Sequence, residues 1–126
     1  MATVDLYNHL SVATTLAPAA RTAAATGATV DLAGYEGALI QAVVGTVTDG
    51  THTLTVEESA DGTTWAAVAA SNLQGSFANL GSNTNQKVGY LGTKRYIRVN
   101  ASVTGATTGG VYGVVVVRGN PRKYPV

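Results

Sequence analysis

The chain has 126 residues and a net charge of +1; 45% of its residues are hydrophobic, 6% aromatic and 12% charged, and none is cysteine. The length suits a single domain that buries about two thirds of its unfolded surface. Without cysteine the chain has no disulfide framework, no thiolate nucleophile and no cysteine metal site. The lack of disulfides favours assembly in a reducing cytosol. The charged fraction is roughly half the usual share, so little like-charge repulsion opposes association, and we expect a component of a larger assembly.

Short extended segments account for most of the chain. Apolar and polar residues alternate from Tyr96 to Thr104, so that Ile97, Val99, Ala101 and Val103 share one face. Glycine-containing turn signals such as Asp49-Gly50 and Asp61-Gly62 recur at short intervals. The pattern predicts about seven or eight strands, near residues 12–16, 28–33, 38–48, 52–60, 64–69, 87–91, 95–104 and 111–118. We therefore expect residues 1–126 to form a single antiparallel β-sandwich of jelly-roll or immunoglobulin-like type.

Several segments depart from this pattern. Residues 16–28 are rich in alanine but are interrupted by Pro18 and Gly27, which favours extended or irregular chain over helix. Residues 71–86 are predicted to form a long loop anchored at Leu73, Phe77 and Leu80. We expect residues 1–20 to include an N-terminal arm. Residues 118–126 contain two prolines and are expected to lie extended across a surface as a C-terminal tail.

The stretch VEESADGTTWAAV, from Val56 to Val68, raises the question of an active site. Adjacent residues of a strand point to opposite faces, so Glu57 and Glu58 cannot form an acid–base pair. Asp61-Gly62 supplies the positive φ that a β-hairpin needs, and the two carboxylates are expected at solvated strand positions. Trp65 is expected to pack its ring into the core.

Other candidates for chemistry are weak. His9 and His52 are far apart in sequence, and we expect His52 at a surface turn where Asp49 is a possible partner. Neither histidine has the spacing of a metal site, and the glycines near residue 110 match no phosphate-binding motif. We expect no catalytic, cofactor-binding or metal-binding residue, no cofactor and no enzymatic activity.

Charge is unevenly distributed along the chain. Residues 1–65 hold all seven acids and one base, a net of −6, whereas residues 66–126 hold seven bases and no acid, a net of +7. A β fold could interleave the two halves, but the pattern slightly favours a polar particle whose basic edge meets an acidic protein. Nucleic-acid binding is unlikely at a net charge of +1 without a known module.

The chain resembles small virion proteins of tailed bacteriophages. The resemblance lies in the stretch TVEESADGTTWAAV, the later YLGTKRYIRVNASVTG, a valine-rich strand and the ending GNPRKYPV. The resemblance covers residues 38–126. It implies a decoration or cement protein that is made in the host cytoplasm and binds the capsid surface. It also implies a homo-oligomer, dimer or trimer, with the major capsid protein as partner.

Two alternatives remain open. The hairpin and the RYIRV strand are also similar to discoidin-type carbohydrate-binding modules, and a head–tail connector or tail subunit is a further possibility. No apolar run approaches the roughly 18 residues of a membrane helix, and the start MATVDLYNHL is not expected to be a signal peptide. The predicted protein contacts lie in the two arms, because their residue types are enriched at interfaces: Tyr7, Leu10, Arg118, Arg122, Lys123 and Tyr124.

Overall fold

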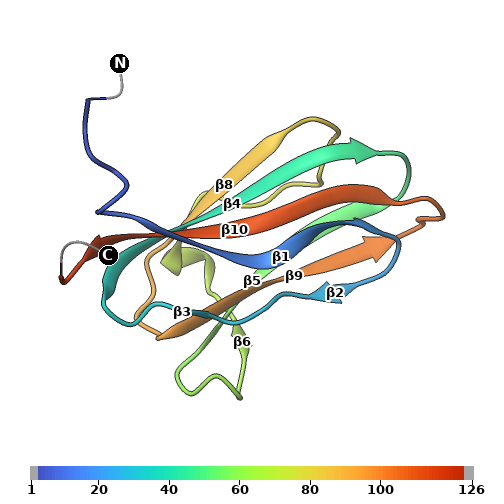
Figure 1. Cartoon of the computed structure of the whole chain (residues 1–126). Coiled ribbons are helices and arrows are strands. Elements are labelled where there is room, and N and C mark those ends of the chain that lie inside the picture. The colour runs from blue at the N-terminus through green and yellow to red at the C-terminus, as the bar shows by residue number, and fades with distance from the viewer. Residues whose placement is uncertain (1–2, 124–126) are drawn as a thin grey trace.

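A computed structural model describes residues 3–123 as two antiparallel sheets that pack face to face (Figure 1). Sheet A has the order β1-β10-β4-β8-β7 and sheet B the order β2-β9-β5-β6, with β3 also paired to β9. The strands of sheet A are β1 (Ser11–Arg21), β4 (Tyr35–Val47), β7 (Leu73–Gln74), β8 (Asn85–Tyr90) and β10 (Gly110–Pro121). The strands of sheet B are β2 (Ala25–Thr26), β3 (Val30–Asp31), β5 (Thr51–Ser59), β6 (Ala66–Ala67) and β9 (Tyr96–Thr104). A single 3-10 turn, η1 (Ala70–Asn72), precedes β7.

The strands pair as the two halves of one long hairpin that is rolled into a sandwich. β1 pairs with β10, β2 and β3 with β9, β4 with β8, and β5 with β6. With β2 and β3 taken as one interrupted strand, and β7 as a short addition to the edge at β8, this is the eight-stranded jelly roll. The predicted antiparallel sandwich is therefore confirmed, in its jelly-roll form. Each of the eight expected segments contains a strand, and β2 and β7 are additional.

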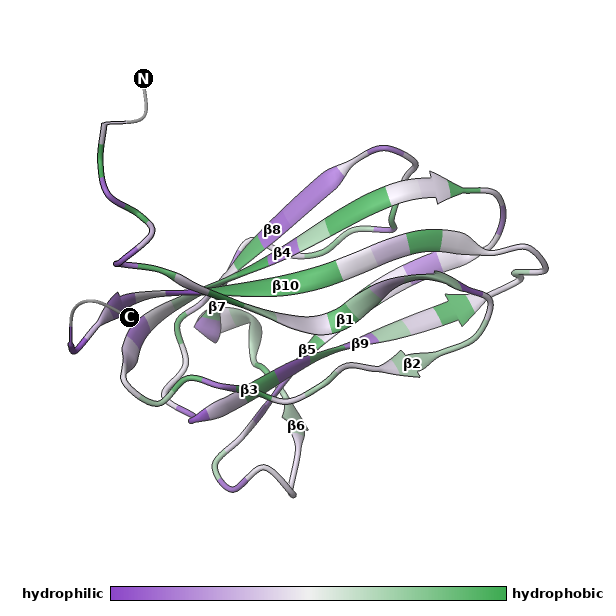
Figure 2. Cartoon of the chain, viewed as in Figure 1, coloured by the Kyte–Doolittle hydropathy of each residue, from purple (hydrophilic) through white to green (hydrophobic). Residues whose placement is uncertain are grey.

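The core lies between the two sheets. The inward side chains Ile40, Val114 and Val116 of sheet A are fully buried, as are Ile97 and Val99 of sheet B. Burying each such side chain stabilises the fold by about 1.5–3 kcal/mol. The predicted alternation along β9 is confirmed, and the hydropathy colouring of Figure 2 shows hydrophobic stretches along β4 and β10.

One hydroxyl joins the two sheets where β1 passes β9. Thr15 Oγ1 donates a hydrogen bond to the carbonyl of Ala28 (2.8 Å) and accepts one from the N–H of Val99 (3.1 Å). A Cβ on Gly27 would lie 2.2 Å from the carbonyl oxygen of Val99, so only glycine allows this approach. Thr15 therefore closes the sandwich on this side.

Proline breaks neither β1 nor β10. Residues 16–28 were expected to be extended or irregular, whereas the tail prolines were expected to keep residues 118–126 out of the sheet. β1 continues past Pro18 to Arg21 because it is an edge strand with register shifts on both sides of Leu16. β10 continues to Pro121, which pairs with Tyr35 at the end of the strand. Residues 118–121 thus belong to sheet A, and the described part of the tail is Arg122 and Lys123.

The loop after β6 is anchored as predicted. Leu80 is buried at 6% exposure, and Leu73 and Phe77 pack partly buried against the core.

The hairpin between β5 and β6 is confirmed, but the place of Trp65 is not. Glu57 pairs with Ala67, and Asp61 Oδ1 accepts hydrogen bonds from the N–H groups of Thr63 and Thr64, each at 2.9 Å. The prediction that Trp65 enters the core is wrong. Its half-buried ring lies on the outer side of sheet B, with the Arg98 guanidinium 4.2 Å from the ring centroid.

The two glutamates on β5 point to opposite faces, as expected, but neither is simply solvated. Glu57 accepts hydrogen bonds from Arg98 (2.8 Å) and Asn100 (2.6 Å) on the outer face. Glu58 accepts one from the hydroxyl of Tyr90 in sheet A. Both are half-buried, because rolling the hairpin brings β9 and β8 close to β5.

His52 is not the surface residue that its position near a turn suggests. It is fully buried, with Nε2 3.0 Å from the backbone carbonyl oxygen of Asp49 and Nδ1 3.1 Å from the hydroxyl of Tyr112. Its ring meets that of Tyr112 edge to face. The turn signal was read correctly, but β10 covers the first residues of β5, which sequence spacing does not reveal.

Two aspartates hold turns through backbone N–H groups. The Asp49 carboxylate accepts hydrogen bonds from the N–H groups of Thr107, Thr108 and Gly109, the last at 2.6 Å. These bonds hold the pKa of Asp49 below its usual value, the Gly109 bond contributing most. The N–H groups of Thr64 and Thr63 lower the pKa of Asp61 in the same way.

Replacing Thr15 by valine is expected to lower the free energy of unfolding by about 1–3 kcal/mol, because the Val99 N–H and the Ala28 carbonyl lose their buried partner. Urea unfolding followed by circular dichroism measures the change. The control is Thr55→Val, at an exposed position of β5, which should change the value by about 0.5 kcal/mol or less. Equal effects for the two variants would show that the Thr15 hydroxyl does not join the sheets.

Stability is expected to fall as the pH drops below about 4. Asp49 and Asp61 have a lower pKa when folded than when unfolded, so the unfolded chain binds more protons in this range. Their contribution is complete above the unfolded pKa and is lost as the pH falls through the folded pKa. Urea midpoints measured from pH 2 to pH 7 test this. The double variant Asp49→Asn with Asp61→Asn should be less stable at pH 7 and should lose less stability on acidification. An unchanged acid dependence in this variant would contradict the assignment.

Candidate functional site

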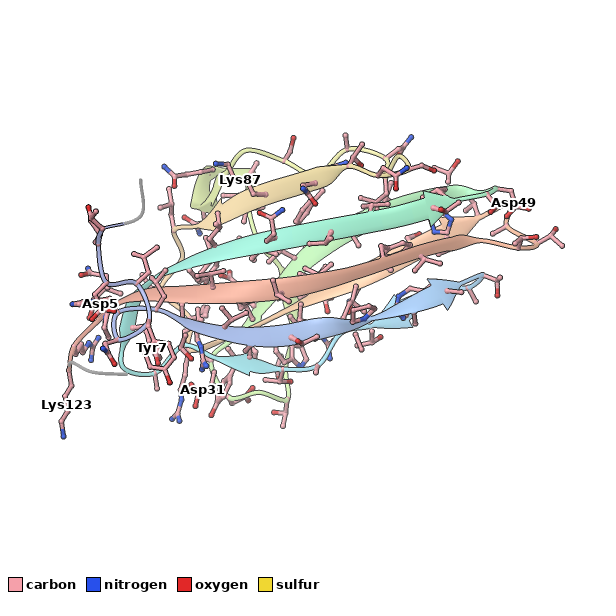
Figure 3. The ribbon with its side chains drawn as sticks, turned by 45° about the horizontal axis from the view of Figure 1, so that its top comes forward. Asp5, Tyr7, Asp31, Asp49, Lys87 and Lys123 are labelled. Carbon is pink, nitrogen blue, oxygen red and sulfur yellow. The ribbon has the colours of Figure 1, made fainter. Side chains whose placement is uncertain are left out.

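Both ends of the described chain leave the sandwich at one end. β1 begins at Ser11, which pairs with Arg118 near the end of β10. Figure 3 shows Asp5, Tyr7, Asp31 and Lys123 at this end, and Asp49 at the opposite one. We call this region the arm end and define it as residues 3–10, 31–38, 90–95 and 118–123.

The N-terminal segment of the arm end is held in a turn. The Asp5 carboxylate accepts hydrogen bonds from the backbone N–H and the side-chain amide of Asn8, at 3.1 and 2.9 Å. These bonds, the side-chain one first, lower the pKa of Asp5. The turn leaves apolar side chains in solvent: the exposed fractions are 76% for Val4, 58% for Leu6 and 88% for Tyr7.

The first residues after this turn pack against the last strand. A Cβ on Gly119 would lie 3.0 Å from Leu10 Cδ2, so Leu10 covers β10 at this point. Arg118 is half-buried beside it, donating to the hydroxyl of Ser11 (2.7 Å) and to the carbonyl of Asp31 (3.0 Å). Its guanidinium lies 5.0 Å from the centroid of the Tyr35 ring. Arg118 therefore acts as a brace within the protein.

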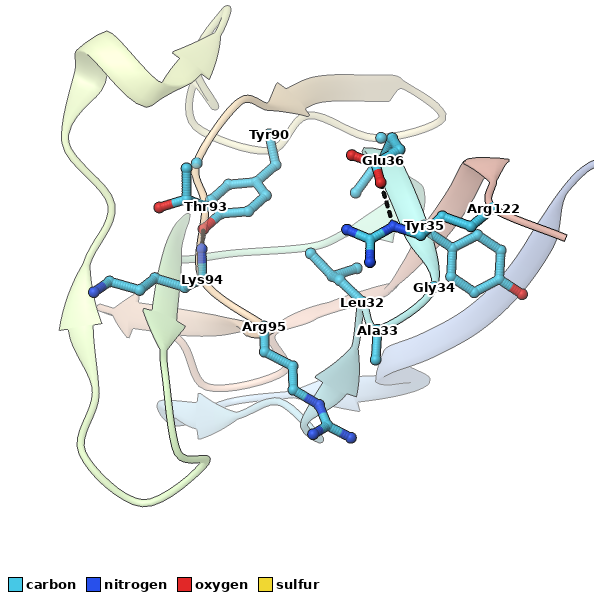
Figure 4. A pocket seen from close by; sticks show the side chains of 13 residues that line it. Leu32, Ala33, Gly34, Tyr35, Glu36, Tyr90, Thr93, Lys94, Arg95 and Arg122 are labelled. Atoms are coloured by element: carbon cyan, nitrogen blue, oxygen red, sulfur yellow. Dashed lines mark hydrogen bonds and ion pairs between the residues drawn. The ribbon is translucent and has the colours of Figure 1, made fainter.

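A pocket of about 470 Å³ opens at the arm end. In Figure 4, Glu36 and Arg122 lie on one side of it, and Tyr90, Thr93 and Lys94 on the other. The loop that forms its second side crosses closely over Tyr90, since a Cβ on Gly92 would lie 2.3 Å from the Tyr90 hydroxyl. That loop can therefore pass the ring only with glycine at this position.

Tyr90 fixes the loop through its hydroxyl, which donates to Glu58 Oε1 (2.8 Å) and accepts from the backbone N–H of Lys94 (3.2 Å). Burial, and then the bond to Glu58, raises the pKa of Tyr90 to about 12. The hydroxyl thus stays protonated at any physiological pH and serves as an anchor.

Acidic partners neutralise part of the positive charge at the arm end. Arg95 makes two hydrogen bonds to Asp31, each 2.9 Å, and these hold the pKa of Asp31 below its usual value. Arg122 pairs with Glu36. Within the described residues, Lys94 and Lys123 take part in no ion pair. The arm end has five bases, Lys94, Arg95, Arg118, Arg122 and Lys123, against three acids, Asp5, Asp31 and Glu36, an excess of +2.

Across the whole fold, ion pairs join the acidic half of the sequence to the basic half. Asp31 with Arg95, Glu57 with Arg98, and Glu36 with Arg122 each connect residues from the two halves. These three pairs favour the interleaving alternative over the polar particle. What remains is the small positive excess at the arm end.

The predicted contact residues divide into two groups. Tyr7, Arg122 and Lys123 are exposed at the arm end, whereas Leu10 and Arg118 are half-buried and pack within the protein. Tyr124 lies outside the described residues. Sequence reasoning missed Val4, Tyr35 and Glu36 as members of this region. The sequence does offer Lys94 and Arg95, as adjacent bases in YLGTKRYIRV that suit a protein contact.

This arrangement is suited to binding. The described carboxylates are occupied by turns, ion pairs or Tyr90. The arm end exposes apolar side chains and ammonium or guanidinium groups beside the carboxylates of Asp5, which is bound in a turn, and Glu36, which is paired with Arg122. Among residues 3–123, no three histidine, aspartate or glutamate side chains are placed to hold a metal ion. In the same part of the chain, no helix has the length and apolar character to span a membrane.

Comparison with known proteins does not assign this chain to a family. No family model matches the chain, and no curated protein does. Among solved structures, that of the infectious bursal disease virus Gx strain is similar to this chain with a TM-score of 0.43 and 16% sequence identity. The match covers 92% of this chain and 33% of that longer chain, so this protein spans about a third of the length of the structure it matches.

Tyr90→Phe is expected to loosen the loop at residues 91–95, because the Lys94 N–H and the half-buried Glu58 carboxylate lose their partner. We expect a loss of about 1–3 kcal/mol of unfolding free energy and faster amide hydrogen exchange at Lys94. The matched control is Tyr96→Phe, whose hydroxyl is hydrogen-bonded by no described residue. If exchange at Lys94 stayed as slow in Tyr90→Phe as in the control, Tyr90 would not be the anchor.

Proposed function

We propose that this chain is a virion structural protein that decorates the head of a tailed bacteriophage and uses its arm end to bind the major capsid protein. The observation that carries the proposal is the meeting, at one end of a rigid sandwich, of exposed Val4, Leu6 and Tyr7 with the bases Arg122 and Lys123. Exposed apolar groups beside a positive excess suit a protein surface that is partly apolar and acidic.

Two of the stretches behind the resemblance to phage virion proteins also contribute to the arm end. The stretch YLGTKRYIRVNASVTG contributes the pocket loop from Tyr90 to Arg95 and then β9, and GNPRKYPV contributes the end of β10 and the tail. The jelly roll itself does not select this function, because lectins and viral capsid proteins share it.

The mechanism is mass action. A protein that binds only the assembled lattice stabilises that lattice by RT ln(1 + [L]/Kd), where [L] is the concentration of the free decoration protein. The half-buried braces Arg118 and Leu10 fix where the arms leave the sandwich, so the exposed groups are positioned before they bind. Preorganisation of this kind reduces the entropy that binding costs.

The carbohydrate-binding alternative has less support. Sugar-binding platforms use free aromatic faces, but the Trp65 ring lies under Arg98 and the Tyr35 ring lies under Arg118. Binding to a glycan array, abolished by changes at the arm end, would favour it. A connector or tail subunit would instead be present in about a dozen copies per particle, as its ring symmetry requires, and quantitative mass spectrometry of virions distinguishes this from a head protein.

Deletion of residues 122–126 is expected to leave the fold intact, because β10 ends at Pro121, and to weaken binding to purified empty shells of the encoding phage by at least about tenfold. Deletion of residues 2–9 should have a similar effect, since it removes the exposed apolar groups. Co-sedimentation with shells measures the affinity. Binding should also weaken between 50 and 500 mM salt, because it includes charge attraction.

The matched controls are two single substitutions that each introduce one negative charge. Lys123→Glu at the arm end should weaken shell binding, whereas Thr55→Glu on the exposed face of sheet B should not. If both deletions bound shells as tightly as the full chain, the arm end would not be the capsid-binding surface.

A further inference from the structure

The outer face of sheet A is largely apolar, and Leu10 and Pro18 cover it only at Gly119 and Gly113. Since Ile40, Val114 and Val116 point into the core, the alternating positions of β4 and β10 point outward. These outward side chains, with one from β1, form what we call the outer valine face: Val12, Leu39, Val43, Val111, Val115 and Val117. A soluble antiparallel sheet usually carries polar residues on such a face.

The exposed apolar surface of the protein is confined to two places. Seven large hydrophobic side chains are exposed in residues 3–123. Four of them lie at the arm end: Val4, Leu6, Tyr7 and Leu91. The other three are Val12 (62%), Val43 (54%) and Val111 (43%), all on the outer valine face. The face is therefore a second surface, separate from the proposed capsid-binding one.

The outer valine face also contains a groove. It has a volume of about 350 Å³ and lies between Val43, Val111 and Val115, with Gly45 and Gly113 at its floor. Pro18 leans over Gly113, where a Cβ would approach its ring to 2.9 Å. The small floor residues let another apolar surface approach closely.

The charge on this face favours a partner with the same surface. Lys87 on β8 is the single charged side chain at the outward positions of the four long strands of sheet A, and none of these positions is acidic. Figure 3 shows Lys87 beside the pale strand β8, at the margin of the sheet. A nucleic acid or an acidic protein would find almost no opposite charge here. A second copy offers a neutral apolar face of the same shape.

The outer side of sheet A, which comprises the outer valine face and the adjoining strand β8, has an area sufficient for self-association. Four strands about 4.8 Å apart, with about eight residues each at about 3.3 Å, cover on the order of 500 Å² per copy. Two copies packed face to face would bury roughly 1,000 Å², which reaches the lower limit of a specific interface.

We propose that the outer valine face is a homodimer interface, in which two copies pack sheet A against sheet A about a two-fold axis. In a two-fold interface the same patch is buried on both copies, as this self-similar face allows. The dimer needs no capsid, so a test of the dimer does not depend on the proposed function. It would hold two arm ends in one particle, and a dimer could then bind a lattice through both.

Sedimentation equilibrium of the full chain, from about 1 to 300 μM, tests the proposal. We expect the mass to rise from 12.8 kDa to twice that value. Val43→Lys should raise the dissociation constant of the dimer at least tenfold, because it buries an unpaired charge in the apolar interface. Thr55→Lys, which adds the same charge to the outer face of sheet B, should leave the dimer unchanged. Circular dichroism and urea unfolding check that both variants are folded.

The absence of cysteine allows a second, independent measurement. Val43→Cys should be cross-linked to a dimer by a short bismaleimide, whereas Thr55→Cys should not. A monomeric full chain at every concentration, or a dimer that survives Val43→Lys, overturns the proposal. So does a dimer that appears only after deletion of residues 2–9, which would mean that the chain's own arm covers the face.

Discussion

The antiparallel ladders between the first and second halves of the chain are the constraint on which the rest of the structure depends. β10 lies between β1 and β4, and its inward residues Val114 and Val116 are fully buried under sheet B. Because β1 begins opposite the end of β10, the N-terminal segment and the tail leave the sandwich together. The arm end is therefore a direct consequence of strand pairing, and so is the pocket between the β3–β4 and β8–β9 connections.

The same pairing explains the electrostatics. Acids are concentrated in the first half of the sequence and bases in the second, so folding the chain back on itself places opposite charges on neighbouring strands. Glu57 on β5 faces Arg98 on β9, and Asp31 on β3 meets Arg95 just before β9. Read along the sequence, the separation of acids from bases suggests a dipolar particle. In the fold, the same separation supplies ion pairs between strands. Opposite charges directly across two strands stabilise a sheet modestly.

Much of the fold, but less of the site, could be predicted from the sequence. Period-two alternation and glycine turns located all eight main strand segments, and Leu80 was placed correctly beneath a loop. For the site, residue type alone selected both Tyr7, which is 88% exposed, and Arg118, which is braced against Ser11 and Tyr35. Sequence cannot separate such residues, because exposure at a strand end depends on which distant segment lies beside it.

The sequence by itself determined that this protein is an antiparallel sandwich with an aliphatic interior, since alternation assigns each side chain to a face and glycine fixes the turns. Only the tertiary structure decided that the sandwich is a jelly roll, that His52 is buried against Tyr112, and that Trp65 lies outside under Arg98. The physical reason is that a strand's own pattern specifies its two faces but not its neighbours. Those neighbours are set by pairing between residues that are tens of positions apart, as Thr15 and Val99 are.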